Sequence, residues 1–147
     1  MISQTAEYAL RAITHLALTP QKAQTSTEIA EATQVPSSYL SKVLQSLGRS
    51  GLIIAQRGLH GGFTLSKSPQ EITVFEIVQA VDPMQRITTC PLGIVSHGAN
   101  LCPLHKRLDA VMETLEASFR QTTIAEILSE PTQSYPLCPR PPKPEQG

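Results

Sequence analysis

The sequence predicts a mainly α fold with one small β-hairpin and a long helix near the C-terminus. Three observations carry this prediction. Apolar residues recur at helical spacing in several segments before residue 82, two short β-rich runs flank a glycine-rich turn after residue 51, and an apolar stripe of about five turns follows residue 104. The 147 residues are enough for one domain with a buried core.

The first predicted helix covers residues 5–18, where apolar residues recur at three-and-four spacing, and Pro20 ends it. A short second helix follows TSTE at residues 25–28, the spacing of a capping box in which Thr25 and Glu28 satisfy each other's backbone amides. The turn over residues 34–36 comes next. We expect Pro36 to take the first position of a third helix, because its missing N–H has no helical partner there.

The third helix is predicted to end near Arg49, with small polar and basic side chains opposite its apolar stripe. Two short helices joined by a tight turn match a helix-turn-helix, whose second helix enters the major groove of DNA. An ordinary solvated helix face would show the same pattern. The side chains suited to bases and phosphates on that face are Ser38, Ser41, Lys42, Gln45 and Arg49.

The run LIIAQR follows Gly51, and FTLS follows GLHGG, so the two runs are predicted to form a hairpin. Directly after a helix-turn-helix, such a hairpin is typical of a wing. Arg57 and His60 lie at its tip, where an arginine can enter the minor groove.

Charge is unevenly distributed along the chain although the net charge is zero. Residues 32–70 contain no Asp or Glu, and Lys42, Arg49, Arg57 and Lys67 give this segment a charge of plus four. An acid-free basic segment favours an anionic partner such as a phosphate backbone. Chance alone could also produce such a gap among twelve acids.

Thr73 is expected to cap a short helix over residues 74–81, which Asp82-Pro83 ends. The long helix after Leu104 carries the stripe and is predicted to pair two chains. A last short helix is expected over residues 124–128. The stripe comprises Leu108, Val111, Met112, Leu115 and Phe119.

Beyond Glu130 the composition changes, because six of the twelve prolines lie in residues 131–147. This composition predicts a disordered or polyproline-like tail. Cys138 lies in it and is expected to be a free thiol.

Cys90 to His105 reads CPLGIVSHGANLCPLH, with two cysteines and two histidines in sixteen residues. Iron–sulfur and zinc sites use thiolate and imidazole ligands on such short loops.

The N-terminus has Glu7 and Arg11 among apolar residues, unlike a secretory signal, and no apolar run is long enough for a bilayer. We therefore expect a cytoplasmic protein, no membrane association, and metal or redox use of the cysteines.

The chain resembles the IscR/NsrR family of winged helix-turn-helix iron–sulfur regulators. The matching motifs run from Met1 to about Leu128 in the family's order: EYALRA, SSYLSKVLQSL, RGxxGGF, ITVFEIVQAVD and CPLH. The resemblance implies a transcriptional regulator, expected to be a repressor, that binds a palindromic DNA operator as a homodimer paired through the long helix. It also implies base reading around Ser38, Tyr39, Ser41 and Lys42, with Arg57 in the minor groove, and Ser37 is a further expected DNA-binding residue.

On this reading the chain has four parts. A winged helix-turn-helix DNA-binding domain covers residues 1–82, and a cluster-binding loop covers residues 83–103. Residues 104–130 form the dimerisation helix and the short terminal helix, and residues 131–147 form the proline-rich tail.

The resemblance also implies a set of cluster ligands. Cys90 and Cys102 match the family's first and last cysteines, His105 matches a following histidine, and Glu7 lies where an acidic ligand would be. The middle cysteine is missing: the midpoint between Cys90 and Cys102 is Ser96, which is followed by His97. A mixed-ligand 2Fe–2S cluster is therefore the predicted cofactor, since imidazole and carboxylate can replace thiolate on iron.

Alternatives stay open. Cys90 and Cys102 could form a thiol pair without a cluster, zinc could take the two cysteines and two histidines, and both histidines could be ordinary surface residues. The winged helix could also serve as a protein-interaction module. No phosphate-binding loop, metalloprotease motif or nucleophile signature is present, so we do not expect an enzyme.

Overall fold

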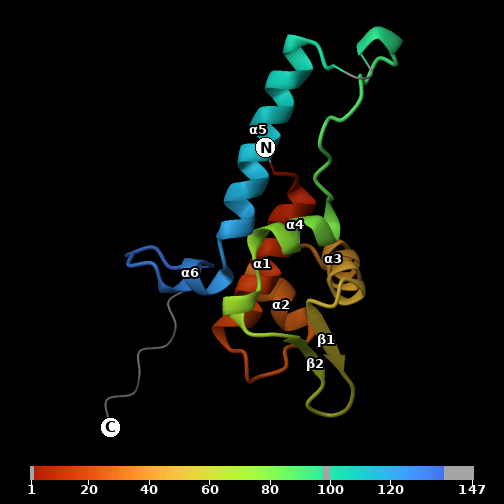
Figure 1. Ribbon diagram of the computed structural model, residues 1–147. Helices are drawn as coiled ribbons and strands as arrows, with labels where there is room; N and C mark the ends of the chain where they lie inside the picture. Colours follow the sequence, from red (N-terminus) through yellow and green to blue (C-terminus); the bar gives the residue numbers. More distant parts are fainter. Residues whose placement is uncertain (1, 98–99, 138–147) are drawn as a thin grey trace.

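The computed structural model describes residues 2–97 and 100–137. Its helices, in chain order, are α1 (Gln4–Leu18), α2 (Ser26–Thr33), α3 (Ser37–Arg49), α4 (Val74–Val81), α5 (Pro103–Gln121) and α6 (Ile124–Ser129). Strands β1 (Ile53–Gln56) and β2 (Gly62–Leu65) form an antiparallel hairpin between α3 and α4. Short 3₁₀ turns cover Pro69–Glu71 and Val95–His97. The predicted mainly α fold with a hairpin is confirmed (Figure 1).

Helix α1 lies at the centre of the core. It contacts α2, α3, α4, α6 and β2, so most of the other helices and one strand of the hairpin pack against it. Alanines at three-residue spacing, Ala6, Ala9 and Ala12, are fully buried on α1 and let neighbouring backbones approach closely. Larger side chains fill the space between the helices, and those with less than 2% exposure include Ile13, Leu16, Ile29, Leu40, Leu47, Ile72, Ile77 and Ile124.

The pattern Thr-x-x-Glu-Ile opens three of the helices, α2, α4 and α6. In each, the threonine hydroxyl accepts a hydrogen bond from the glutamate N–H, and the glutamate carboxylate accepts one from the threonine N–H. The second and third of these caps lie together, because Thr73 and Thr123 form an antiparallel bridge. The bridge fastens the C-terminal helix to the start of α4.

The start of α3 differs from the expectation by one residue. Gln34 adopts a left-handed conformation with φ 55° that ends α2, and Pro36 is extended. The helix begins at Ser37, so the prediction that Pro36 takes its first position was wrong. The Pro36 carbonyl instead accepts hydrogen bonds from the N–H groups of Tyr39 and Leu40, at 3.0 and 2.9 Å.

The hairpin is tied to the helices through Gln24, in the connection between α1 and α2. The backbones of Gln24 and Phe63 exchange hydrogen bonds of 3.0 and 2.7 Å. Gly62 has φ +148°, and a Cβ there would lie 2.5 Å from the Gln24 backbone. Only glycine therefore permits this close approach between β2 and the α1–α2 connection.

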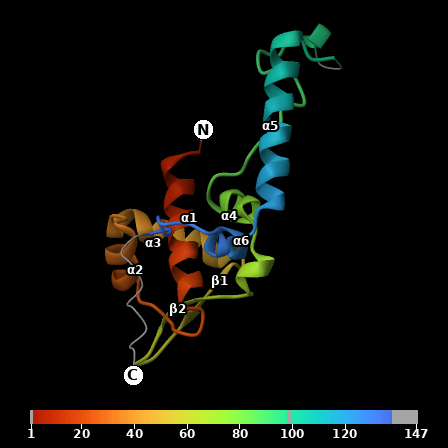
Figure 2. The same cartoon turned by 90° about the vertical axis from the view of Figure 1, so that its left-hand side faces the viewer.

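Helix α5 extends away from the core and carries the cysteine loop to the end of the molecule opposite the hairpin (Figures 1 and 2). Its predicted stripe divides into two parts. Met112 and Phe119 are half-buried and line a hollow with Ala6 and Val78. The other large apolar side chains of the face are exposed: Leu104, Leu108, Val111 and Leu115. None of the helices in the described ranges could cross a lipid bilayer.

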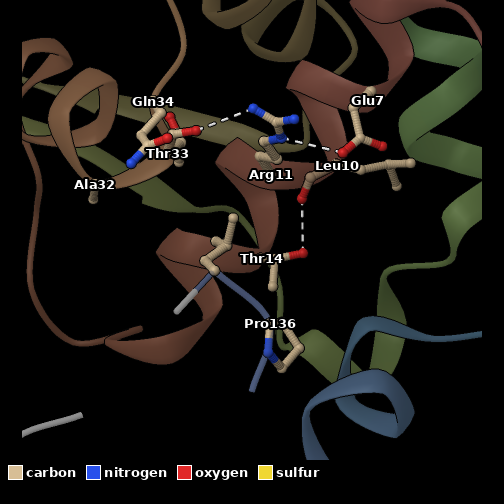
Figure 3. A pocket seen from close by; sticks show the side chains of 9 residues that line it. Glu7, Leu10, Arg11, Thr14, Ala32, Thr33, Gln34 and Pro136 are labelled. Carbon is tan, nitrogen blue, oxygen red and sulfur yellow. Dashed lines mark hydrogen bonds and ion pairs between the residues drawn. The ribbon is translucent and has the colours of Figure 1, made fainter. Parts of the chain in front are cut away.

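The first residues of the expected tail pass beside the helical core. Residues 131–137 form neither helix nor strand. Pro136 and Leu137 line a hollow together with residues of α1 and the end of α2, where Figure 3 shows Pro136 beside Thr14. Cys138 and the rest of the tail lie outside the described residues.

Candidate nucleic-acid interface and cysteine loop

Helix α3 is amphipathic, and its packing determines which side chains are available to a ligand. Leu40, Val43, Leu44 and Leu47 are buried against the core, as predicted. Every predicted contact residue on the helix is exposed, because it lies off this stripe. These residues are Ser37, Ser38, Tyr39, Ser41, Lys42, Gln45 and Arg49. Small hydroxyls, an amide and two cations therefore lie on one solvent-facing surface.

Tyr39, at the start of α3, is supported from α1. Its ring contacts the Tyr8 ring edge to face, with centroids 6.0 Å apart. The Arg11 guanidinium lies over the Tyr8 ring, 5.6 Å from its centroid. Arg11 also donates to Glu7 Oε1 at 3.1 Å and to the Thr33 carbonyl at 3.3 Å (Figure 3). A continuous set of contacts thus joins Glu7 to the N-terminal turn of α3.

The hairpin tip lies on the same side of the molecule as α3, away from α5 (Figures 1 and 2). Arg57 and His60 are both exposed there. Of the four cations in the acid-free segment, Lys67 is neutralised, because its Nζ lies 2.7 Å from Glu76 Oε1. Within the described ranges no carboxylate pairs with Lys42, Arg49 or Arg57. The basic character of α3 and the wing therefore comes from these three side chains.

The cysteine loop places one thiol beside an imidazole. Cys102 immediately precedes α5, and its Sγ lies 3.4 Å from His105 Nδ1, one helical turn on. Cys90 is buried with 8% exposure, and its carbonyl accepts a hydrogen bond from the Gly93 N–H. His97 ends a 3₁₀ turn, and its Nδ1 is buried without a hydrogen-bond partner among the described residues.

One chain does not bring the expected ligands together. Thiolate and imidazole donors suit an iron–sulfur cluster or zinc, yet in residues 2–97 and 100–137 no three cysteine, histidine or acidic side chains gather as a metal site. Cys102 and His105 are adjacent, whereas Glu7 lies on α1 paired with Arg11. Of the expected ligand residues, the described part of one chain brings Cys102 and His105 together.

Several residues that shape these surfaces were missed by sequence reasoning. Arg86, on the segment entering the cysteine loop, makes two hydrogen bonds of 2.7 Å to Asp109 of α5. Gln24 is buried, and its side chain bonds to His15 and Thr19 while its backbone pairs with the wing. The residues in each of these contacts lie far apart in sequence or in irregular segments. The helical and strand periodicity of the sequence therefore does not predict that they meet.

Comparisons with known proteins identify the family. The family model described as Rrf2, iron-dependent transcriptional regulator, matches residues 2–130. An HTH-type transcriptional regulator of Aquifex aeolicus is 28% identical over 132 residues, which cover 88% of this chain and 92% of that protein.

Solved structures share the fold. T. potens IscR has a TM-score of 0.72 at 22% identity over 87% of this chain and 85% of its own. CymR of B. subtilis, described as a global cysteine regulator, has a TM-score of 0.70 at 22% identity over 86% and 95%. CymR of Staphylococcus aureus has a TM-score of 0.71 at 23% identity over 89% and 100%. The chain therefore belongs to the Rrf2 family of DNA-binding, winged-helix transcriptional regulators.

Proposed function

We propose that this chain is a cytoplasmic, homodimeric repressor whose affinity for a palindromic operator is set by an iron–sulfur or redox-sensing site in the loop from Cys90 to His105. The observation that carries the DNA-binding part is the exposed face of α3 beside the wing. It combines hydrogen-bonding side chains with cations that have no carboxylate partner among the described residues, which is the chemistry that base edges and phosphates require.

In this proposal α3 enters the major groove. Ser37, Ser38, Tyr39, Ser41 and Gln45 face base edges or sugars, and Lys42 and Arg49 bind phosphates. The wing follows the adjacent backbone, with Arg57 in the minor groove and His60 near a phosphate. The contact of the Tyr39 ring with the Tyr8 ring would hold the first turn of α3 in position for contact with the bases.

The exposed part of α5 supports dimerisation. Leu104, Leu108, Val111 and Leu115 are from 36% to 66% exposed, and they follow one another along one side of the helix. A continuous apolar face of this kind is stabilised when a second copy covers it. A two-fold pair presents two copies of α3, which fits a palindromic operator with half-sites about one helical turn apart.

The proposed sensor is a 2Fe–2S cluster held by Cys90, Cys102, His105 and Glu7, with His97 as the alternative to His105 or Glu7. The close Cys102–His105 pair and the iron dependence in the family's description support it. Such a cluster supplies a redox-active centre whose charge and stability depend on the conditions. Glu7 would reach the loop from the second chain. The contacts from Glu7 through Arg11 and Tyr8 to Tyr39 would then couple the position of the Glu7 carboxylate to the first turn of α3.

A second candidate is a thiol sensor or zinc site without a cluster. It is favoured by the finding that one chain brings no three metal ligands together in its described part. Cys90 and Cys102 are both free thiols, so oxidation of either or both would change the loop. A structure of Staphylococcus aureus CymR is described as the oxidised form, which shows that a protein of the same fold has been studied in that state.

Two measurements test the proposal. Protein purified without oxygen should have visible absorption with equal iron and sulfide, whereas a colourless protein with zinc or no metal would favour the second candidate. Binding to a DNA fragment from the protein's own promoter should survive excess nonspecific duplex. Absence of sequence-specific binding by the reduced, the oxidised and the metal-free protein alike would instead favour a protein-interaction role for the winged helix.

A further inference from the structure

The wing carries an apolar side chain at its tip. Leu59 and His60 are the two corner residues of a turn that the Gly61 N–H closes by donating to the Gly58 carbonyl at 3.0 Å. Leu59 is 96% exposed, the largest exposure of any large apolar residue in the described part of the chain. It contributes nothing to the core and is therefore available to contact a partner outside the chain.

The turn that presents Leu59 is tightly constrained. A Cβ at Gly61 would lie 2.5 Å from the Gln56 carbonyl oxygen and 2.9 Å from that of Gly58. Gly58, with φ +111°, begins the turn in a conformation that side chains disfavour. Just behind the turn, β2 is bound to the buried Gln24 through the two hydrogen bonds with Phe63. These restraints fix the direction of the tip relative to the helices.

The chemistry around the tip suits the minor groove of DNA. Arg57, two residues before Leu59, is exposed and has no carboxylate partner among the described residues, and no acid occurs between residues 32 and 70. Proteins that enter the minor groove combine cations at the backbone with apolar wedges that separate base steps. An arginine followed by a protruding leucine on a rigid turn provides both.

We propose that Leu59 is a specificity-determining residue that enters the minor groove beside Arg57 and contacts a flexible pyrimidine–purine step. The proposal rests on the placement of the wing against DNA given above. Such steps unstack more readily than others, so a leucine wedge selects them without hydrogen bonding to a base. The selected step lies outside the bases that α3 reads.

The test is selection of binding sites from a pool of random duplexes by the wild type, Leu59→Ala and Ile54→Ala. Ile54 lies on β1 of the same hairpin and is 51% exposed, so its variant is a matched control. The wild type and Ile54→Ala should enrich the same inner and flanking positions. Leu59→Ala should keep the inner preference, lose the flanking preference, and bind the wild-type site about ten-fold more weakly.

A fluorescence measurement tests directly whether Leu59 unstacks the flanking base step. In the selected duplex, 2-aminopurine at the flanking step should brighten when the wild type binds, because unstacking relieves its quenching. Leu59→Ala should give no such increase at saturating protein, and Leu59→Met should restore it. Equal site preferences and equal brightening for the wild type and Leu59→Ala would overturn the inference while leaving DNA binding intact. Failure of the wild type to enrich any sequence would overturn the proposed function as well.

Discussion

Arg86 holds Asp109 through two parallel hydrogen bonds of 2.7 Å, and the Ile87 N–H donates to the same carboxylate at 2.9 Å. This bidentate contact joins the segment that enters the cysteine loop to the long helix that leaves it. The hydrogen bonds from Arg86 lower the pKa of Asp109 below its ordinary value, and the Ile87 N–H acts in the same direction. The position of Cys90, four residues beyond Arg86, is thereby linked to α5.

Asp109→Ala should release the entering segment from α5. The Ile87 amide should then exchange its hydrogen faster at neutral pH, because its acceptor is gone. The control is Glu116→Ala, which removes the partner of Arg120 on the same helix and should leave Ile87 unchanged. Equal exchange at Ile87 in the wild type and Asp109→Ala would show that this contact does not hold the loop.

The same contact should weaken in acid. Since the pKa of Asp109 is lower in the folded chain than its ordinary value of 3.8 in the unfolded chain, the charged form favours folding. That stabilisation is fully present above pH about 4 and is lost as the pH falls through the folded-state value. Protection of the Ile87 amide, measured relative to the unfolded rate at each pH, should fall over this range. Unchanged protection across it would contradict the assignment.

Gly62→Ala should destabilise the domain by roughly 2–4 kcal/mol, because the added Cβ meets the Gln24 backbone in a conformation that favours glycine. Urea unfolding monitored by circular dichroism measures the change. Gly48→Ala is the matched control, because Gly48 is on α3 with open space around its Cβ position. Alanine there should raise the free energy of unfolding by about 0.5–1 kcal/mol. Similar unfolding midpoints for the two variants would mean that the hairpin does not approach Gln24 this closely.

Val111→Lys should turn the proposed dimer into a monomer. Val111 is 66% exposed in the single chain, so the substitution leaves the core intact and acts on the face assigned to pairing. Sedimentation should show half the mass, and operator binding should weaken. Ala117→Lys places the same charge at another exposed position of α5, off the apolar face, and should remain dimeric. A dimeric Val111→Lys protein would exclude this face as the interface.

Lys42→Ala and Arg57→Ala should each weaken DNA binding. Each removes one cation that displaces counterions from the DNA, Lys42 at a phosphate and Arg57 in the minor groove, so the slope of log affinity against log salt should become shallower by about 0.9 per variant. Fluorescence anisotropy over a salt series measures both effects. Arg107→Ala, on α5, should leave the slope unchanged. If neither Lys42→Ala nor Arg57→Ala alters affinity or slope, α3 and the wing do not contact DNA as proposed.

The sequence predicts the local elements well and the long-range contacts poorly. The period of Leu40, Val43, Leu44 and Leu47 identified α3 and its buried face, because a helix buries one stripe whatever it packs against. The glycine-rich turn likewise located the hairpin. Pro36 was placed one residue too far into α3, since proline is compatible with both positions.

The candidate site divides in the same way. The family resemblance assigned Cys102 and His105 to one site, and the structure places Cys102 Sγ 3.4 Å from His105 Nδ1, because residues three apart meet on a helix turn. No such rule relates Glu7 to the cysteines, and in one chain Glu7 pairs with Arg11 instead. The Arg86–Asp109 contact spans 23 residues and an irregular segment, so only the folded chain shows it.

Whether the cysteine loop sets operator affinity can be measured by comparing the wild type with a Cys90→Ala, Cys102→Ala double variant. Both proteins are purified without oxygen, and their affinities for the same promoter fragment are measured at one salt concentration. The affinity of the double variant should differ clearly from that of the wild type, with α3 and the wing still folded by circular dichroism. Equal affinities, with metal or cluster present in the wild type alone, would contradict it.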